Sequence, residues 1–131
     1  MNELTQRLQN ADEAGVFRLN CELQRLHAVA AEANVPLLET DLSTVHSKGE
    51  FLAALAQAIG APEWFGNNWD ALADALQDLS WLATPAYVLL LRNGDEQLGL
   101  SSAEHKIALQ IFDEAVAFWK SQGKPFWVFF C

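Results

Sequence analysis

The chain has 131 residues, of which 51% are hydrophobic, and this composition predicts one compact domain with an ordinary core. Its 17 acidic and 8 basic residues give a formal net charge of -9, which repels nucleic acid and anionic membranes and excludes both as expected direct partners. Two cysteines without metal-ligand spacing, and no apolar run typical of a signal peptide or a membrane span, predict a cytoplasmic protein with reduced, inert cysteines.

The N-terminal part of the chain is predicted to begin with a polar leader. Residues 1–14 form this leader, which we expect to be loosely attached to a single domain of residues 15–131. GVFRL, residues 15–19, has the composition of a short strand. Asn20 follows it as a candidate N-cap for a helix over residues 21–33, where apolar side chains recur at helical spacing.

The middle of the chain continues the alternation of strands and helices. Pro36 opens a second strand, PLLETDL, because proline is tolerated at the first position of a strand. Ser47 and Glu50 form the capping-box pattern S-x-x-E at the start of a helix. The expected buried residues of that helix are Phe51, Leu52, Leu55 and Ile59. A further helix is predicted within PEWFGNNWDALADALQDLSWL, residues 62–82.

The last third of the chain predicts two buried strands around a long helix. After Pro85, the nearly continuous apolar run AYVLLL is typical of a strand covered on both faces. Ser101 and Glu104 form a second capping box. Gly123 ends the helix and Pro125 opens the strand PFWVFF. The wide apolar face of this helix would consist of Ile107, Ile111, Phe112, Ala115, Phe118 and Trp119.

Strands that alternate with helices predict an α/β fold. Such a pattern favours βαβ units, and here a parallel sheet of about four strands with right-handed crossovers. The pattern does not determine the order of the strands in the sheet.

Three carboxylates recur at helical spacing in the middle of the chain without an intervening lysine or arginine. Asn68, next to Asn67, offers an N-cap that places Asp70 in the first turn, where the helix dipole favours negative charge. Asp74 is then mid-helix and Asp78 near the C-terminal end, and like charges four residues apart destabilise a helix by roughly 0.2–0.5 kcal/mol per pair. The stripe therefore has a local cost to stability.

Two interpretations of the stripe stay open at this point. One is that a very acidic protein accumulates solvated carboxylates without a specific role. The other is a binding surface, because interfaces combine aromatic anchors with charges that match the partner. Aromatic residues are close in sequence, although each tryptophan alone is more often a core residue; they are Trp64, Phe65, Trp69 and Trp81. Phe65, Trp69, Leu72 and Leu76 are candidates for the buried side.

Enzymatic and metal-binding interpretations have little support in the residues. Asp70 and Asp74 have no histidine near them in sequence and no third ligand at suitable spacing. The histidines at positions 27, 46 and 105 are scattered, and no phosphate-cradling glycine loop or Gly-x-Ser-x-Gly motif occurs. We therefore expect no catalytic residues, no cofactor and no metal.

The segment from Pro62 to Leu76 fits the pattern P-E-[aromatic]-[aromatic]-G-x-N-x-D-A-L-x-D-x-L. This pattern resembles the signature of the barstar-like family, intracellular inhibitors of secreted ribonucleases. The resemblance extends over about residues 36–131, through Trp81, the AYVLLL strand, the Phe-x-Glu-Ala of the long helix and the terminal apolar strand. It implies a three-layer type of arrangement with a small parallel sheet of three to four strands packed with helices. The residues before position 36 would then add an edge strand.

The resemblance also implies how such a protein binds its partner. In the family, the helix of the motif and the loop before it enter the cationic active site of the ribonuclease. The matching acidic positions are Asp70 and Asp74, the loop aromatic matches Trp64, and the long-helix glutamate matches Glu114. Gly66 would allow close backbone approach. The candidate partner-binding residues are Trp64, Gly66, Asn68, Asp70, Asp74, Trp81 and Glu114.

Two functions are therefore carried forward. The first is an inhibitor or immunity protein whose partner is a barnase-like ribonuclease or another basic protein. The second is a barstar-like binding or regulatory module whose partner is not a ribonuclease. The acidic positions and the loop aromatic favour the first. The second is favoured by Ala73, where the ribonuclease inhibitor of the family has a tryptophan, and by a segment before Trp81 that is longer than in that inhibitor.

Overall fold

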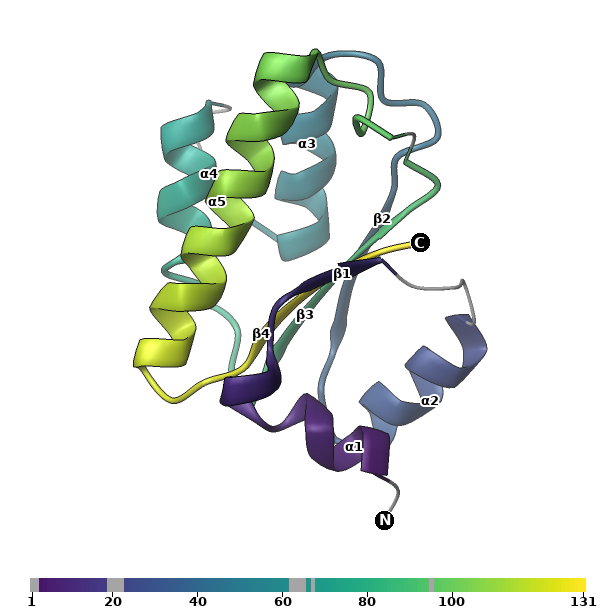
Figure 1. The fold of residues 1–131 in the computed structure, drawn as a ribbon, viewed down its shortest axis with the longest axis vertical. Coiled ribbons are helices and arrows are strands. Elements are labelled where there is room, and N and C mark those ends of the chain that lie inside the picture. The colour runs from purple at the N-terminus through teal and green to yellow at the C-terminus, as the bar shows by residue number, and fades with distance from the viewer. Residues whose placement is uncertain (1–2, 19–22, 62–65, 67, 95) are drawn as a thin grey trace.

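The structure, a computed structural model, describes residues 3–18, 23–61, 66, 68–94 and 96–131. Its centre is a four-stranded, fully parallel sheet in the order β1-β4-β3-β2 (Figure 1). The strands are β1 (Val16–Arg18), β2 (Leu37–Asp41), β3 (Tyr87–Arg92) and β4 (Phe126–Phe130). The predicted α/β fold and the predicted N-terminal edge strand are both confirmed.

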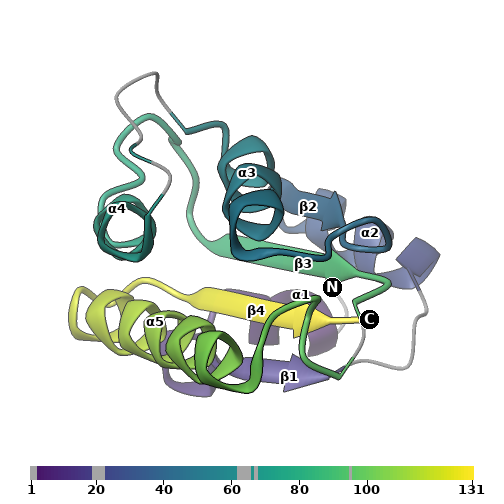
Figure 2. The same ribbon diagram turned by 90° about the horizontal axis from the view of Figure 1, so that it is seen from above.

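Helices cover both faces of the sheet and make three layers (Figures 1 and 2). On one face lie α3 (Lys48–Ile59), α4 (Trp69–Leu76) and α5 (Ser102–Ser121). The other face carries α1 (Glu3–Leu8) and α2 (Leu23–Glu32), and the short 3-10 helix η1 (Ala11–Glu13) leads from α1 into β1. Asn20, the predicted cap of α2, lies outside the described residues. None of the described helices is long and apolar enough to cross a membrane.

β3 supplies side chains to a hydrophobic core on each face. Leu89 and Leu91 belong to the larger core under α3, α4 and α5, whereas Val88 and Leu90 belong to the smaller core under α1 and α2. All four side chains are buried. This two-sided burial confirms the expectation drawn from the continuous apolar run AYVLLL.

The helix starts follow the predicted caps closely. Ser101 accepts a hydrogen bond from the backbone of Glu104, and the Glu104 carboxylate accepts one from Ser101, which is a full capping box. Ser47 likewise accepts from the backbone of Glu50, at 3.2 Å. There the Glu50 carboxylate accepts from the backbone of His46, one residue before the cap, so that the predicted box is modified.

Three tryptophans close the C-terminal ends of three helices. The indole N–H groups of Trp127, Trp81 and Trp119 donate to the carbonyls of Leu8, Ile59 and Leu76, at 3.0, 2.8 and 2.7 Å. Each acceptor is the last residue of its helix, namely α1, α3 and α4. Because terminal helix carbonyls lack a partner within the helix, these indoles satisfy groups that would otherwise need water.

The end of the predicted leader lies against the domain. Leu8 is 5% exposed and Ala14 is 6% exposed, and both belong to the smaller core. Arg7 and Glu13 form an exposed ion pair of 3.5 Å. The division of the chain at residue 14 stays a prediction, and the burial of Leu8 and Ala14 favours a leader that is integrated with the domain.

Leu8→Ala tests this integration. If the leader is part of the folded core, the substitution lowers the free energy of unfolding by about 2–3 kcal/mol, as expected for a truncated buried leucine. Urea denaturation measures the change, with Gln6→Ala, at an exposed position of the same helix, as the control. A loss no greater than that of the control would show that the leader is loose.

The cysteines differ from the prediction. Cys131 is disulfide-bonded, whereas the sequence analysis expected two reduced cysteines. Cys21, the other cysteine of the sequence, lies outside the described residues. Cys131 directly follows β4, and sequence spacing carries no information about which distant segments come close to the end of a central strand.

Candidate protein-binding site

The helix α4 is anchored on one side and exposed on the other. Leu72, Ala75 and Leu76 are completely buried, as predicted for the two leucines. The ring of Trp69 is half-buried against Phe51, with the ring centroids 6.0 Å apart. Phe65 lies outside the described residues. α4 packs mainly on α5 and α3, so that its outer side is presented at the edge of the molecule (Figure 2).

Two carboxylates occupy the outer side of α4. Asp70 and Asp74 are both exposed and lie one helical turn apart. Asn68 caps the helix by accepting a hydrogen bond from the backbone of Ala71 at 2.7 Å, as predicted. Asp70 is consequently in the first turn, where the helix dipole favours it.

The third predicted carboxylate of the stripe is not on the helix. α4 ends at Leu76, and the backbone N–H of Asp78 donates to the Ala75 carbonyl in the turn that follows. Leu79 has a positive φ of 49° and is fully buried. The chain therefore leaves the helix early in order to bring Leu79 into the core, and the prediction of three carboxylates on one helix was wrong.

The loop residues next to the cap are held by a short-range hydrogen bond. Asn68 Nδ2 donates to the Gly66 carbonyl at 3.0 Å. A Cβ at Gly66 would lie 3.3 Å from that nitrogen, which is a tight contact. Gly66, Asn68 and Asp70 are thus brought together at the start of α4. Trp64 lies outside the described residues.

The neighbouring helix α5, which packs against α4, carries a further exposed carboxylate. Glu114 is exposed and accepts a hydrogen bond from Gln110 Nε2 at 3.1 Å. His105 and Leu109 of α5 face β1, and Glu114 lies roughly 140–180° around the helix from them. We call Asp70, Asp74 and Glu114 the acidic surface.

Ile107 is a candidate contact residue that the sequence analysis misplaced. It was expected on the buried face of the long helix, yet it is 39% exposed. It lies seven residues before Glu114 and therefore on nearly the same side of α5. Its side chain is therefore accessible to a partner that binds at Glu114. The sequence did not indicate this exposure, because the apolar positions of α5 span a wider face than the one that packs against the rest of the protein.

Trp81 points inward in this structure. Its indole binds the Ile59 carbonyl at the end of α3, and the side chain packs against the larger core. Its indole therefore serves the fold at the end of α3. Contact between Trp81 and a partner stays a prediction.

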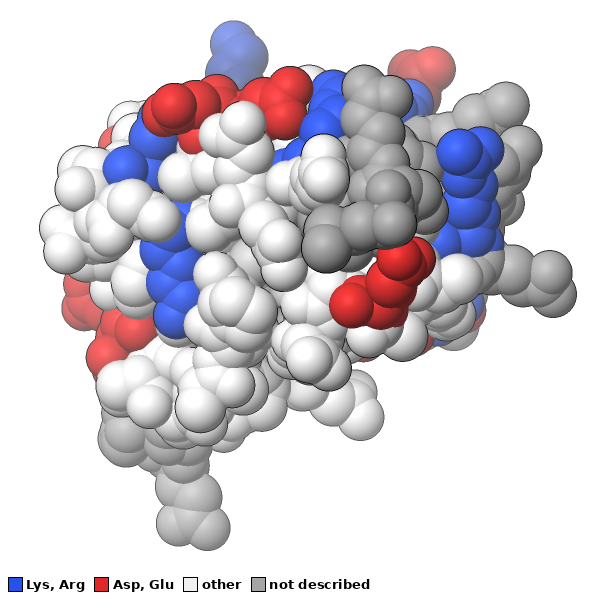
Figure 3. Space-filling view, turned by 90° about the horizontal axis from the view of Figure 1, so that it is seen from below, with Lys and Arg blue, Asp and Glu red and all other residues white. Residues whose placement is uncertain are grey.

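The acidic surface exposes negative charge to solvent. The described residues contain no group of three His, Cys, Asp or Glu side chains that could hold a metal ion. At the end of β2, outside this region, hydrogen bonds from Ser43 and Asn93 lower the pKa of Asp41. Among the described residues on the face seen from below, acidic and basic side chains are interspersed around an uncharged centre (Figure 3).

Comparison with known protein families identifies the family of the chain. The family model described as Barstar (barnase inhibitor) matches residues 35–131. The chain belongs to the barstar family. No individual curated protein matches the chain. The barstar match begins just before β2, so that α1, η1, β1 and α2 precede the matched region. Barstar-family proteins are inhibitors rather than enzymes, which agrees at family level with the expected absence of catalysis.

In this barstar-family chain, Trp119 is the positioning residue that sequence reasoning missed. Its indole joins the end of α4 to α5, and thereby fixes the two helices that carry the acidic surface. Its place in the apolar repeat predicted burial but not the bond to Leu76.

Trp119→Phe should loosen α4 selectively. The ring can still pack on Tyr87, whose centroid is 4.9 Å away, but the Leu76 carbonyl loses its donor. We expect a loss of about 1 kcal/mol in unfolding free energy and faster native-state hydrogen exchange in α4. Trp81→Phe is the matched control, because it removes the equivalent bond at the end of α3. Equal exchange in α4 of both variants would contradict the assigned role.

Proposed function

We propose that this chain is an inhibitor that binds a ribonuclease and blocks its cationic active site with the acidic surface. The observation that carries the proposal is the pair Asp70 and Asp74, exposed one turn apart on a helix that contains no basic residue. Membership of the barstar family supports a ribonuclease as the class of partner.

Rigidity makes this arrangement suitable for inhibition. The buried leucines, the Asn68 cap and the Trp119 bond hold α4 before any partner arrives. Preorganised side chains lose little conformational entropy on binding, so that more of their interaction energy appears as affinity. A ribonuclease active site binds RNA phosphate through cationic side chains. Carboxylates can form ion pairs with the same side chains, but unlike RNA they offer the enzyme no phosphodiester bond to cleave.

The overall charge supports rapid association. A net charge of -9 attracts a basic enzyme over a distance, and salt screens this attraction. The association rate is therefore expected to fall as the salt concentration rises.

The first experiment is a titration of the protein against a panel of barnase-type microbial ribonucleases, with RNA cleavage as the readout. The proposal expects stoichiometric inhibition of at least one enzyme, with an association rate that decreases with salt. Circular dichroism of the same preparation shows that the protein is folded. Folded protein that inhibits no enzyme in the panel would count against a barnase-type ribonuclease as the partner and would favour the second candidate below.

A second candidate is a barstar-family module that binds a protein other than a ribonuclease. It is favoured by the segment before residue 35, which adds β1, α1 and α2 outside the family match. Capture of a non-ribonuclease partner that is lost when Asp74 is replaced would support it.

The cytoplasmic location stays a prediction. The disulfide of Cys131 counts against a permanently reducing compartment, because disulfides rarely persist there.

A further inference from the structure

The strand β1 has one free edge among the described residues. It pairs with β4 alone, and the backbone N–H of Val128 donates to the Gly15 carbonyl at 3.0 Å. Backbone groups alternate in direction along a strand, so Gly15 and Phe17 direct theirs toward β4, while Val16 and Arg18 direct theirs outward. This edge therefore offers donors and acceptors to a further strand.

The side chains beside this edge leave room for such a strand. Phe17 contacts Trp127 and Phe129, at 5.8 and 6.3 Å between ring centroids, yet 45% of it is exposed. On the opposite face, a hollow of about 250 Å³ lies next to the strand, lined in part by Val16, Arg18, Glu96, His105, Leu109 and Phe130. α5 therefore does not close over the edge.

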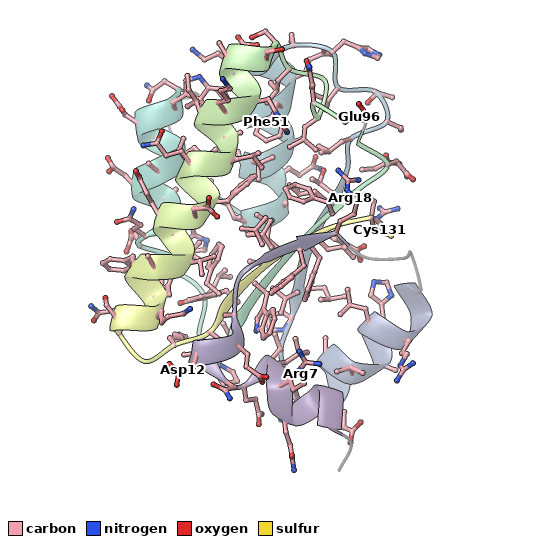
Figure 4. All side chains as sticks on the ribbon, viewed as in Figure 1. Arg7, Asp12, Arg18, Phe51, Glu96 and Cys131 are labelled. Atoms are coloured by element: carbon pink, nitrogen blue, oxygen red, sulfur yellow. The ribbon has the colours of Figure 1, made fainter. Side chains whose placement is uncertain are left out.

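Opposite charges stand at the two ends of β1 (Figure 4). Asp12 and Glu13 lie in η1, two residues before the strand, and Arg18 ends it. Arg18 lies over the ring of Phe130 at 6.0 Å, and neither Arg18 nor Asp12 forms an ion pair with a described residue. A second β1 in antiparallel orientation would bring Arg18 of each copy toward the acidic end of the other. Parallel orientation would place like charges together.

We infer that two copies of this chain associate through antiparallel pairing of their β1 strands, which joins the two sheets into one continuous sheet. With Phe17 opposite Phe17 of the other copy, Val16 pairs with Arg18 across the two-fold axis, and the outward backbone groups bond each other. The two phenylalanines form a cross-strand aromatic pair. α5 separates β1 from α4, so that the acidic surface of each copy stays accessible (Figure 2).

Sedimentation equilibrium of the full chain, from micromolar to near-millimolar concentration, tests the association. The expected result is a reversible monomer–dimer equilibrium. Phe17→Lys places a charge on the exposed edge and should raise the dimer dissociation constant at least about tenfold. Circular dichroism verifies the fold of the variant. A wild-type protein that is monomeric at every concentration would overturn the inference.

Charge reversal tests the orientation of the strands. Arg18→Glu and Asp12→Lys should each weaken self-association, because each places like charges together in its own dimer. A mixture of the two variants should restore association as a heterodimer, since both contacts are then complementary. Glu32→Lys, at an exposed site on α2, is the control and makes the same change of charge as Asp12→Lys. A dimer dissociation constant that neither charge reversal changes, or a mixture of the two variants that stays monomeric, would contradict antiparallel β1 pairing. Neither result bears on ribonuclease binding, because α4 is untouched.

Discussion

Asp74→Ala is expected to weaken binding to the inhibited ribonuclease by about 2–5 kcal/mol, or roughly thirty-fold to several-thousand-fold in Kd. Asp74 is exposed in the middle of α4, so that its carboxylate is available to the cations of the partner. Truncation removes the interaction and leaves those cations desolvated and unpaired. Isothermal titration calorimetry, or inhibition of RNA cleavage where binding is very tight, measures the loss.

Folding stability separates this effect from simple unfolding. Alanine is a strong helix former, and the change removes a like-charge contact with Asp70, so thermal stability should be unchanged or slightly higher. Asp78→Ala is the matched control, because Asp78 is also an exposed aspartate but lies beyond the end of the helix. Equal losses of affinity in the two variants would mean that general negative charge, and not the acidic surface, drives binding.

Gly99→Ala is expected to have the largest effect on stability among single glycine substitutions. Gly99 has a positive φ of 76°, and a Cβ there would overlap the backbone carbonyl oxygen of Val45 and lie 2.8 Å from its carbonyl carbon. The loop between β3 and α5 would have to move away from the loop after β2. We expect a loss of about 3–5 kcal/mol, which combines left-handed backbone strain with overpacking.

Gly123→Ala isolates the backbone contribution. Gly123 has a similar φ of 72°, but a Cβ there meets nothing within 4 Å. This variant should lose only about 1–2 kcal/mol. Urea denaturation of both variants gives the difference, which corresponds to the clash with Val45. A similar loss of unfolding free energy in the two variants would show that the loop at Gly99 moves away from Val45 without an energetic cost.

The strands and most helix starts could be predicted because they depend on local chemistry. The caps at Asn68 and Ser101 satisfy amides within the same few residues, and the burial of AYVLLL follows from its composition. The position of Asp70 in the first turn of α4 follows from the Asn68 cap.

The remaining features depend on contacts between distant segments. The strand order requires β4 to enter between β1 and β3, which no local pattern encodes. α4 stops before Asp78 because Leu79 is needed in the core, and Ile107 is exposed because no described helix covers that side of α5. The role of Trp119 depends on a carbonyl that lies far away in sequence.

The position of β4 has a consequence for synthesis of the protein. β4 is the last strand along the chain, yet it is the neighbour of both β1 and β3. While the ribosome still holds residues 126–130, β1 has no strand to pair with, and only β2 and β3 can form a sheet. The nascent chain therefore cannot reach its native topology gradually from its N-terminus. Completion of the sheet must wait until β4 has left the ribosome, and until then the newly made N-terminal segment is open to chaperones and proteases.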